Sequence, residues 1–426
     1  DGRYDQVNVD LSPLAGRSIR FILTTLATGV ATNDRAIWSA PRILRASTTP
    51  PTITPAPPTL TPPTVVPPPV VPSPNINDLQ MIDSSNGWAI GNSYVLRTAD
   101  GGATWYNVSM PNVSSFGRGF FQTASKGWVF GADANNGAVS LFRTTNGGTT
   151  WAAYNNLPFS GGSIQFLDDL NGFVMSGMPD GMHKHVIQLY QTFNGGATWS
   201  LKYAIDPLQP NNTLPFGGIK QGMTFRDTSI GWIGGYVPTT GFIYLYKTTN
   251  GGTSWAQQVL PIPSGYESAD MNTTAPTFFG PNDAILPVWM TIGIGQRDLF
   301  LYVTHDGGAT WNFSTAFARN SSSTEFVSTR DVFSWNFGGF MQATNDGGAT
   351  WSQLTSNVNF GESVRDMDFV STTTGWVLDI DDDGNTSFYR TNDGGLHWIA
   401  LFGNGSTPTQ TPTAAPPVSP AGLVQE

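Results

Sequence analysis

The sequence predicts an all-β protein whose main domain is a seven-bladed β-propeller. A nine-residue phrase close to Lys-Thr-Thr-Asn-Gly-Gly-Thr-Ser-Trp occurs seven times along the 426 residues. Consecutive phrases end 40 to 56 residues apart, which is the length of a four-stranded propeller blade. Aromatic residues make up 12% of the chain and glycine accounts for 48 positions, a composition that suits short strands joined by tight turns.

Composition divides the chain into four regions. Residues 1–46 contain strand-like runs such as "RSIRFIL", broken by Pro, Gly or Asn. Residues 47–74 form a Pro/Thr-rich linker, with twelve prolines between positions 48 and 74, and such a segment favours extended polyproline II. Residues 75–404 hold the seven repeats, and residues 405–426 form a second Pro/Thr-rich tail. The chain begins in the middle of a strand-like pattern, so we expect it to be a piece of a longer precursor.

Each repeat contains a turn whose chemistry is clear from its residues. Asp-Gly and Asn-Gly pairs supply the positive φ of a tight hairpin, and the Asp, Asn and Thr side chains can accept backbone N–H groups inside it. The closing Trp is expected to bury its ring and fix the turn to its blade. The seven Asp/Asn–Trp pairs are Asp100 and Trp105, Asn146 and Trp151, Asn194 and Trp199, Asn250 and Trp255, Asp306 and Trp311, Asp346 and Trp351, and Asp393 and Trp398.

A second recurring feature is a Gly-Trp pair at the start of the second expected strand in four repeats. All four strands of each blade occur in sequence order. We therefore expect residues 77–83 to open the first blade and residues 398–402 to close the last, without a strand borrowed from the other terminus.

These phrases resemble the Asp-box, or BNR, repeat, and the resemblance covers residues 75–403. It implies that the turns are scaffold and lie away from the ligand-binding face. The combination of Gly-Trp with the turn phrase is most similar to the photosystem II assembly and stability factor family. Members of that family are single seven-bladed propellers that bind partners without catalysis, through an arginine-rich face, whereas this chain has few arginines. Residues 1–46 resemble the closing strands of galactose-binding-like β-sandwiches, which are common as carbohydrate-binding modules.

A ligand site is expected on the face opposite the turns, where the loops of blades 3 to 5 are long and uneven. Three cations, Arg118, Lys220 and Arg365, are expected on the innermost strands together with Gln165 and Glu325, and they suggest an anion or carboxylate site. The aromatic residues Tyr266, Trp289 and Trp335 are candidates for stacking on sugar rings or anchoring a peptide.

One segment resembles the opening of a calcium loop. "DIDDDGNTS" places Asp379, Asp381, Asp383 and Asn385 at alternate positions, with a glycine for the sharp turn. Arg390 stands where such loops carry a bidentate Glu, so a plain acidic hairpin is the alternative. A smaller motif, Asp180 with His183 and His185, suits either a transition-metal site or a solvated strand edge.

Several classes of function are excluded or disfavoured. The net charge of −10 without a cluster of basic residues argues against nucleic acid as a partner. No apolar run is long enough to span a membrane, and the absence of cysteine excludes thiol nucleophiles. The Pro/Thr stalks are typical of exported bacterial proteins, so we expect an extracellular or cell-surface location.

The functional hypothesis is a non-enzymatic propeller that binds carbohydrate or an extracellular protein segment. The alternative is a sialidase- or xyloglucanase-like glycoside hydrolase, with Glu267 and Asp270 as the acid–base pair. The arginine triad and opening motif of sialidases are not recognisable, and the two-propeller xyloglucanases place their carboxylates between propellers. A structural component of an extracellular assembly is the third possibility.

Overall fold

The computed structural model describes residues 68–403, except 180–183, 209–211, 294–295, 362–363 and 381–383. The chain divides into two units, Asp1–Val65 and Val66–Glu426, and the description concerns the second. The predicted β-sandwich piece, most of the linker and the tail from residue 404 lie outside the described residues. Every regular element in the described part is a β-strand, and none of its segments is a helix able to cross a membrane.

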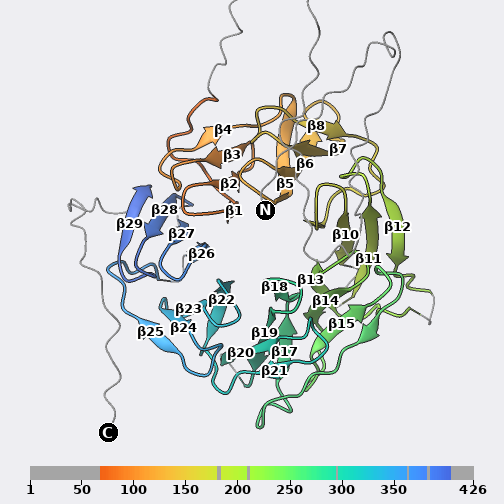
Figure 1. Cartoon of the computed structure of the whole chain (residues 1–426), viewed down its shortest axis with the longest axis vertical. Helices are drawn as coiled ribbons and strands as arrows, with labels where there is room; N and C mark the ends of the chain where they lie inside the picture. Colours follow the sequence, from red (N-terminus) through yellow and green to blue (C-terminus); the bar gives the residue numbers. More distant parts are fainter. Residues whose placement is uncertain are drawn as a thin grey trace, which may run out of the picture. The chain divides into compact units, whose positions relative to one another are not determined.

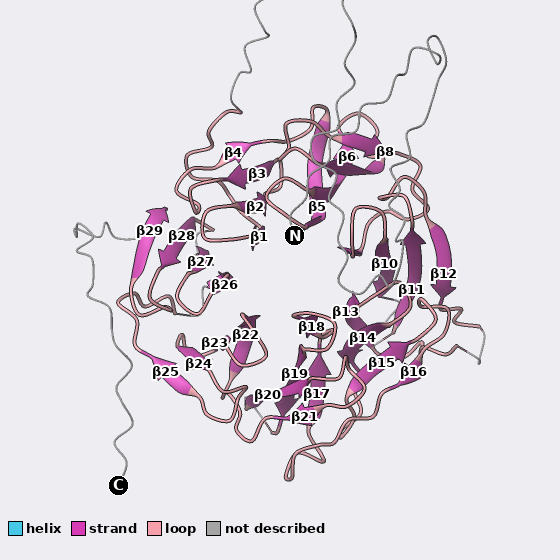
Figure 2. Cartoon of the chain, viewed as in Figure 1, coloured by secondary structure: helices cyan, strands magenta, loops and turns pink. Residues whose placement is uncertain are grey.

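Seven groups of antiparallel strands follow one another along the chain and surround a common centre (Figures 1 and 2). In each blade the first strand lies innermost and the last lies at the rim. The blades are β1 Asp78–Met81, β2 Gly87–Ile90, β3 Val95–Thr98 and β4 Tyr106–Asn107; β5 Val113–Phe121, β6 Gly127–Asp133, β7 Val139–Thr144 and β8 Ala152–Tyr154; β9 Ser163–Phe166, β10 Gly172–Pro179, β11 His185–Thr192 and β12 Ser200–Ala204; β13 Ile219–Phe225, β14 Gly231–Tyr236, β15 Tyr244–Thr248 and β16 Ala256–Gln257; β17 Asp270–Thr273, β18 Thr277–Phe278, β19 Ala284–Thr291, β20 Arg297–Thr304 and β21 Asn312–Phe313; β22 Ser321–Phe326, β23 Val332–Asn336, β24 Met341–Thr344 and β25 Ser352–Leu354; and β26 Val364–Phe369, β27 Gly375–Ile380, β28 Thr386–Thr391 and β29 Trp398–Phe402. The predicted seven-bladed propeller is confirmed.

The seven repeated turns join the third and fourth strands and share one hydrogen-bond pattern. In the first blade, the Thr98 hydroxyl donates to Asp100 and accepts from the Gly102 N–H, while Asp100 accepts from the Thr104 N–H. Both glycines of every turn have positive φ, for example 71° at Gly101. The predicted roles of the Asp or Asn, the Thr and the glycines in forming the turn are therefore confirmed.

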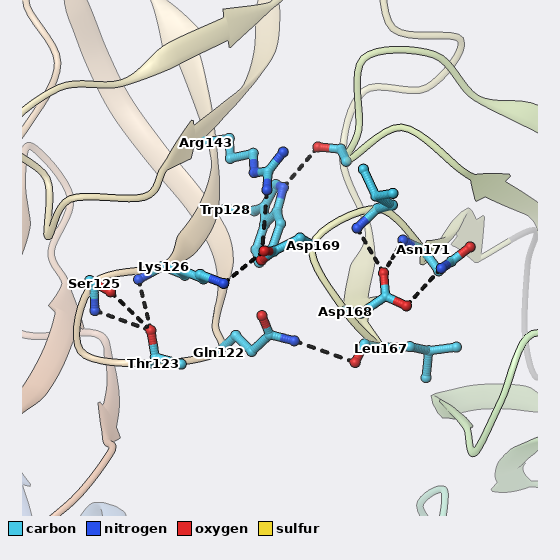
Figure 3. A network of polar contacts seen from close by, with 12 residues as sticks. Gln122, Thr123, Ser125, Lys126, Trp128, Arg143, Leu167, Asp168, Asp169 and Asn171 are labelled. Atoms are coloured by element: carbon cyan, nitrogen blue, oxygen red, sulfur yellow. Dashed lines mark hydrogen bonds and ion pairs between the residues drawn. The ribbon is translucent and has the colours of Figure 1, made fainter. Parts of the chain in front are cut away.

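The Gly-Trp pairs hold neighbouring blades together, as Figure 3 shows for blades 2 and 3. The Trp128 indole N–H donates to the Gly195 carbonyl in the turn of the next blade, at 2.9 Å. The Arg143 guanidinium lies over the Trp128 ring at 5.1 Å, and Lys126 forms an ion pair with Asp169 at 2.7 Å. The Trp of each Gly-Trp pair lies directly opposite a Lys or Arg on the third strand of its own blade. The pairs therefore stabilise the contacts between blades.

Blades 4 and 5 depart from the regular pattern because their strands are hydrogen-bonded into one sheet. Tyr236 of β14 pairs with Asn272 of β17, and the innermost strand of blade 5 is interrupted between β17 and β18. A side chain at Gly234 would overlap the Thr274 carbonyl oxygen, so the close approach of these backbones requires glycine.

The ring closes between blades 7 and 1 without an exchanged strand, as predicted. Both blades contain four strands in sequence order. Trp376 donates its indole N–H to the Gly101 carbonyl at 2.8 Å, and Trp105, Trp376 and Phe388 belong to one buried apolar cluster. The closure therefore depends on side-chain packing and hydrogen bonds rather than on a shared sheet.

Candidate functional site

A cleft lies on blades 2, 3 and 4, on the face opposite the seven turns. It has a volume of about 600 Å³. Its walls come from the beginnings of β5, β9 and β13 and from the facing ends of β6, β7, β10 and β11. The predicted face is therefore the one that carries the cleft, although the cleft begins one blade earlier than the loop lengths suggested.

The innermost strand of blade 2, β5, is irregular where it borders this cleft. The pairing of β5 with β6 shifts register between Phe116 and Gly119, so Gly117 and Arg118 face no partner residue in β6. Both residues line the cleft, and Arg118 is exposed. The structure thus places the predicted cation Arg118 at a strand irregularity on the cleft wall, where its guanidinium is suited to a ligand that carries a carboxylate.

Lys220 also lines the cleft, but its ammonium is not available to a ligand. The residue is 3% exposed, and its Nζ lies 2.6 Å from the Pro215 carbonyl and 3.0 Å from the Gly218 carbonyl. Three further backbone carbonyls, those of His185, Phe216 and Gly217, lie within 3.3 Å. Burial lowers the pKa of the Lys220 amine to about 7, whereas carbonyl oxygens only accept hydrogen bonds and favour the ammonium form. The prediction of Lys220 as a ligand contact is corrected: it holds the loop 215–218 in place.

His185 forms part of the same wall. Its Nδ1 accepts the backbone N–H of Lys220 at 3.2 Å. Burial and then the Lys220 charge lower the pKa of His185, so the imidazole is neutral at pH 7. The other two residues of the predicted transition-metal motif, Asp180 and His183, lie outside the described residues.

The three aromatic residues predicted as ligand platforms are core residues, and that prediction is wrong. Trp289 and Trp335 are 7% and 4% exposed, and their indole N–H groups donate to Ser321 and Gly361. Tyr266 is 9% exposed and donates its hydroxyl to Asp298 at 2.7 Å. Each ring fills space within or between blades, so none presents a face to a ligand.

The alternative catalytic pair lies outside the cleft. Glu267 is exposed and accepts the Gly265 N–H at 2.9 Å within its own loop, and Asp270 is exposed at the start of β17. Neither residue lines the cleft, and no carboxylate is among the described residues that do.

Asp379 lies near the end of β27, and Asn385 lies just before β28. The acidic hairpin connects these two strands. Asp381 and Asp383 lie outside the described residues, so the calcium-loop prediction for this segment remains a prediction. Arg365 is exposed on β26, two blades away from the cleft around the ring.

A group of carboxylates was missed by sequence reasoning, apart from Glu325. Asp78 of β1, Glu325 of β22, and Asp366 and Asp368 of β26 lie on three consecutive innermost strands around the ring closure. Burial raises the pKa of Asp366 to about 6 and of Asp368 to about 7, and the charges of neighbouring carboxylates add to both effects. The sequence shows that these carboxylates lie on expected inner strands, but it does not show that they lie close together, because that depends on ring closure.

Known proteins similar to this chain fall into more than one group. No protein-family model matches the chain. A xyloglucanase from a Paenibacillus species is 27% identical over 260 residues, which cover 53% of this chain and 24% of that protein. The structure of the GH74 enzyme from Niastella koreensis has a TM-score of 0.53 and 17% identity, covering 76% of this chain and 54% of that chain. The structure titled "YCF48 bound to D1 peptide" has a TM-score of 0.46 and 19% identity, covering 75% of this chain and 96% of that one.

These similarities establish the fold and leave the activity open. The likeness to the Niastella enzyme is that of a β-propeller. The chain spans about a quarter of the length of the curated xyloglucanase that it matches.

Proposed function

We propose that this chain is a non-enzymatic binding propeller that holds an extended carbohydrate bearing carboxylate groups in the cleft of blades 2 to 4. The observation that carries the proposal is the exposed Arg118 at the irregularity of β5, within a cleft of about 600 Å³. A guanidinium pairs with a carboxylate through two parallel hydrogen bonds, and the serine and glutamine side chains of the lining suit hydroxyl partners.

The lining favours binding over hydrolysis. A glycoside hydrolase usually needs two carboxyl groups on either side of the scissile bond. The described lining supplies hydroxyls from Ser115, Ser160 and Ser163 and the amide of Gln221, but no carboxyl group. An acidic protein segment is the second candidate ligand, because it offers the same carboxylates on an extended chain.

The hydrolase alternative is favoured by the sequence similarity to a xyloglucanase. It would use Glu267 and Asp270, which are both exposed in one loop-to-strand segment of blade 5. Under that alternative, a neutral glucan would be cut rather than held.

The test is calorimetric titration of the full chain with uronic-acid oligosaccharides, neutral xyloglucan oligosaccharides and acidic peptides, with released reducing sugar assayed in parallel. Arg118→Gln should weaken binding of the uronic-acid ligand about tenfold or more, because a charge-assisted pair contributes about 1.5 to 3 kcal/mol. Arg365→Gln, an exposed arginine outside the cleft, is the matched control and should leave binding unchanged.

Release of reducing sugar that is abolished by Glu267→Gln or Asp270→Asn would replace the proposal with the hydrolase alternative. Tight binding of acidic peptides alone would move the function to a protein partner. Equal losses in the Arg118 and Arg365 variants would exclude the cleft as the site.

We further propose an extracellular or cell-surface location, on the composition of the Pro/Thr-rich stalks. Protease treatment of intact cells should remove the protein from the cell fraction if this is correct, and protection from the protease would contradict it.

A further inference from the structure

Two glutamines on innermost strands clamp one blade to the next. Gln80 of blade 1 donates its amide to the Phe121 carbonyl of blade 2 at 2.8 Å and accepts the Phe121 N–H at 3.2 Å. Gln165 of blade 3 makes the same pair of bonds with Phe225 of blade 4, at 3.1 and 2.7 Å. In each case the amide uses one N–H as donor and its oxygen as acceptor, and so satisfies both backbone groups of the partner residue.

Asp368 occupies the corresponding position in blade 7. Gln80, Gln165 and Asp368 each precede the last residue of their inner strand, and each lies opposite an aromatic residue of the second strand. The partner of Asp368 is Met81, the last residue of β1, just as Phe121 and Phe225 end their own inner strands. Asp368 accepts the Met81 N–H, so the clamp also spans the ring closure.

We propose that Asp368 acts in this clamp as a neutral carboxylic acid, so that closure of the ring between blades 7 and 1 is linked to a proton. A protonated carboxyl group offers an O–H donor beside a carbonyl acceptor, much as the NH₂ and carbonyl of a side-chain amide do, and can bond to both backbone groups of Met81. An ionised carboxylate only accepts, so it can bond to the Met81 N–H but not to the Met81 carbonyl.

The charges around Asp368 favour the neutral form. Asp366 lies on the same strand as Asp368, β26. Asp78 lies on β1 and Glu325 on β22, the two inner strands that pack beside β26. Burial raises the pKa of Asp368 most, and the charges of Asp366 and Asp78 raise it further. Burial followed by Asp368 and Asp366 likewise raises the pKa of Glu325 well above its usual value.

Two arginines lie near this group of carboxylates. Burial raises the pKa of both Asp366 and Asp78, and the charges of Arg365 and of Arg118 on β5, respectively, offset part of that rise. Neither is among the causes of the shift at Asp368.

The direction of the pH dependence follows from the raised pKa. An acid whose pKa is higher in the folded protein stabilises it fully below about pH 4, and this stabilisation is lost as the pH rises to about 7. The closure between blades 7 and 1 is therefore expected to be weaker at pH 8 than at pH 5.

The test compares melting temperatures of the full chain and its variants at pH 5 and pH 8. Asp368→Asn replaces the acid by a permanent donor and acceptor, and it should raise the melting temperature by at least about 2 °C at pH 8 but hardly change it at pH 5. Gln80→Glu makes the reverse change, from amide to acid, at the clamp between blades 1 and 2. It should lower the melting temperature at pH 8, and by less at pH 5. Asp270→Asn, on the inner strand of blade 5, changes the net charge equally and should show no such pH dependence.

A local measurement separates the clamp from a general charge effect. Hydrogen exchange of peptides covering β1 and β26, corrected for the intrinsic pH effect, should show less protection at pH 8 than at pH 5, and Asp368→Asn should abolish the difference. A loss of stability in Asp368→Asn at both pH values would show that the residue works as a carboxylate and would overturn the proposal. No effect of Asp368→Asn at either pH, or an unchanged pH response of Gln80→Glu, would also overturn it.

Discussion

Replacing Lys220 by Met is the most informative single change to the wall of the candidate cleft. The substitution keeps the length of the apolar side chain but removes the ammonium, which five backbone carbonyls surround at 2.6 to 3.3 Å. The residue is 3% exposed, so water cannot simply replace the lost donor. Four of these carbonyls belong to the consecutive residues 215–218. The loop geometry thus depends on one cation.

The magnitude follows from the number of protons rather than the number of carbonyls. An ammonium has three N–H donors, so at most three strong bonds form at a time. At about 1 to 1.5 kcal/mol net for each bond, Lys220→Met should lower the free energy of unfolding by about 3 to 5 kcal/mol. Removing the cost of burying a charge offsets part of this loss, and the carbonyls left without a donor add to it.

Urea denaturation of the full chain and its variants is the appropriate assay, with the free energy of unfolding extrapolated to water. Lys247→Met is the matched control, because Lys247 donates to one carbonyl, that of Gly308 at 3.0 Å, and its Nζ lies over the Trp232 ring at 5.0 Å. That control should cost about 1 kcal/mol. If Lys220→Met lowers the free energy of unfolding no more than Lys247→Met does, the ammonium does not organise the loop. Lys220 would then again be a candidate ligand contact.

Three further predictions concern other parts of the ring. Gly234→Ala should cost more than about 2 kcal/mol in a thermal melt because its Cβ overlaps the Thr274 carbonyl oxygen, whereas Gly217→Ala, where a Cβ has open space, should cost only a few tenths; equal costs would contradict the close approach. Hydrogen bonds from Thr and backbone N–H groups hold the pKa of the turn carboxylates low, at about 2 for Asp346. The stabilisation that they provide is therefore present above about pH 4 and is lost as the pH falls. Changing all four turn aspartates to Asn should reduce the fall in melting temperature at acid pH, and an unchanged fall would refute this. If the acidic hairpin at 379–387 binds calcium, CaCl₂ should raise the melting temperature after chelator treatment and Asp379→Asn should remove the shift, whereas no shift with calcium would favour the plain hairpin.

The repeated elements could be predicted because their cause is local. Asp or Asn followed by two glycines requires positive φ at both glycines, and the Thr two residues before it caps the turn within the same few residues. Seven copies at blade-length spacing then imply the ring. The Gly-Trp pairs were recognised as recurrent, but their role in holding neighbouring blades together required the partner blade to be in place.

The ligand residues were harder to predict because exposure is a property of the assembled blades. Trp289 and Tyr266 have the residue types of a binding site, yet packing against neighbouring strands buries both. Lys220 was placed correctly on an inner strand, but the loop 215–218 folds over its ammonium. Arg118 lies on an inner strand and is exposed in the cleft, as expected, at a strand irregularity that the sequence pattern did not indicate.

The sequence by itself determined the all-β class, the seven blades, the strand order within each blade and the chemistry of the turns, because each of these depends on interactions within about ten residues or on a simple period. Only the tertiary structure decided which polar groups meet. Asp368 and Met81 are separated by 287 residues in the chain, and ring closure brings them into contact. Burial and neighbouring charge then give that carboxyl group a pKa near 7, because both effects sum over strands that lie far apart in the sequence.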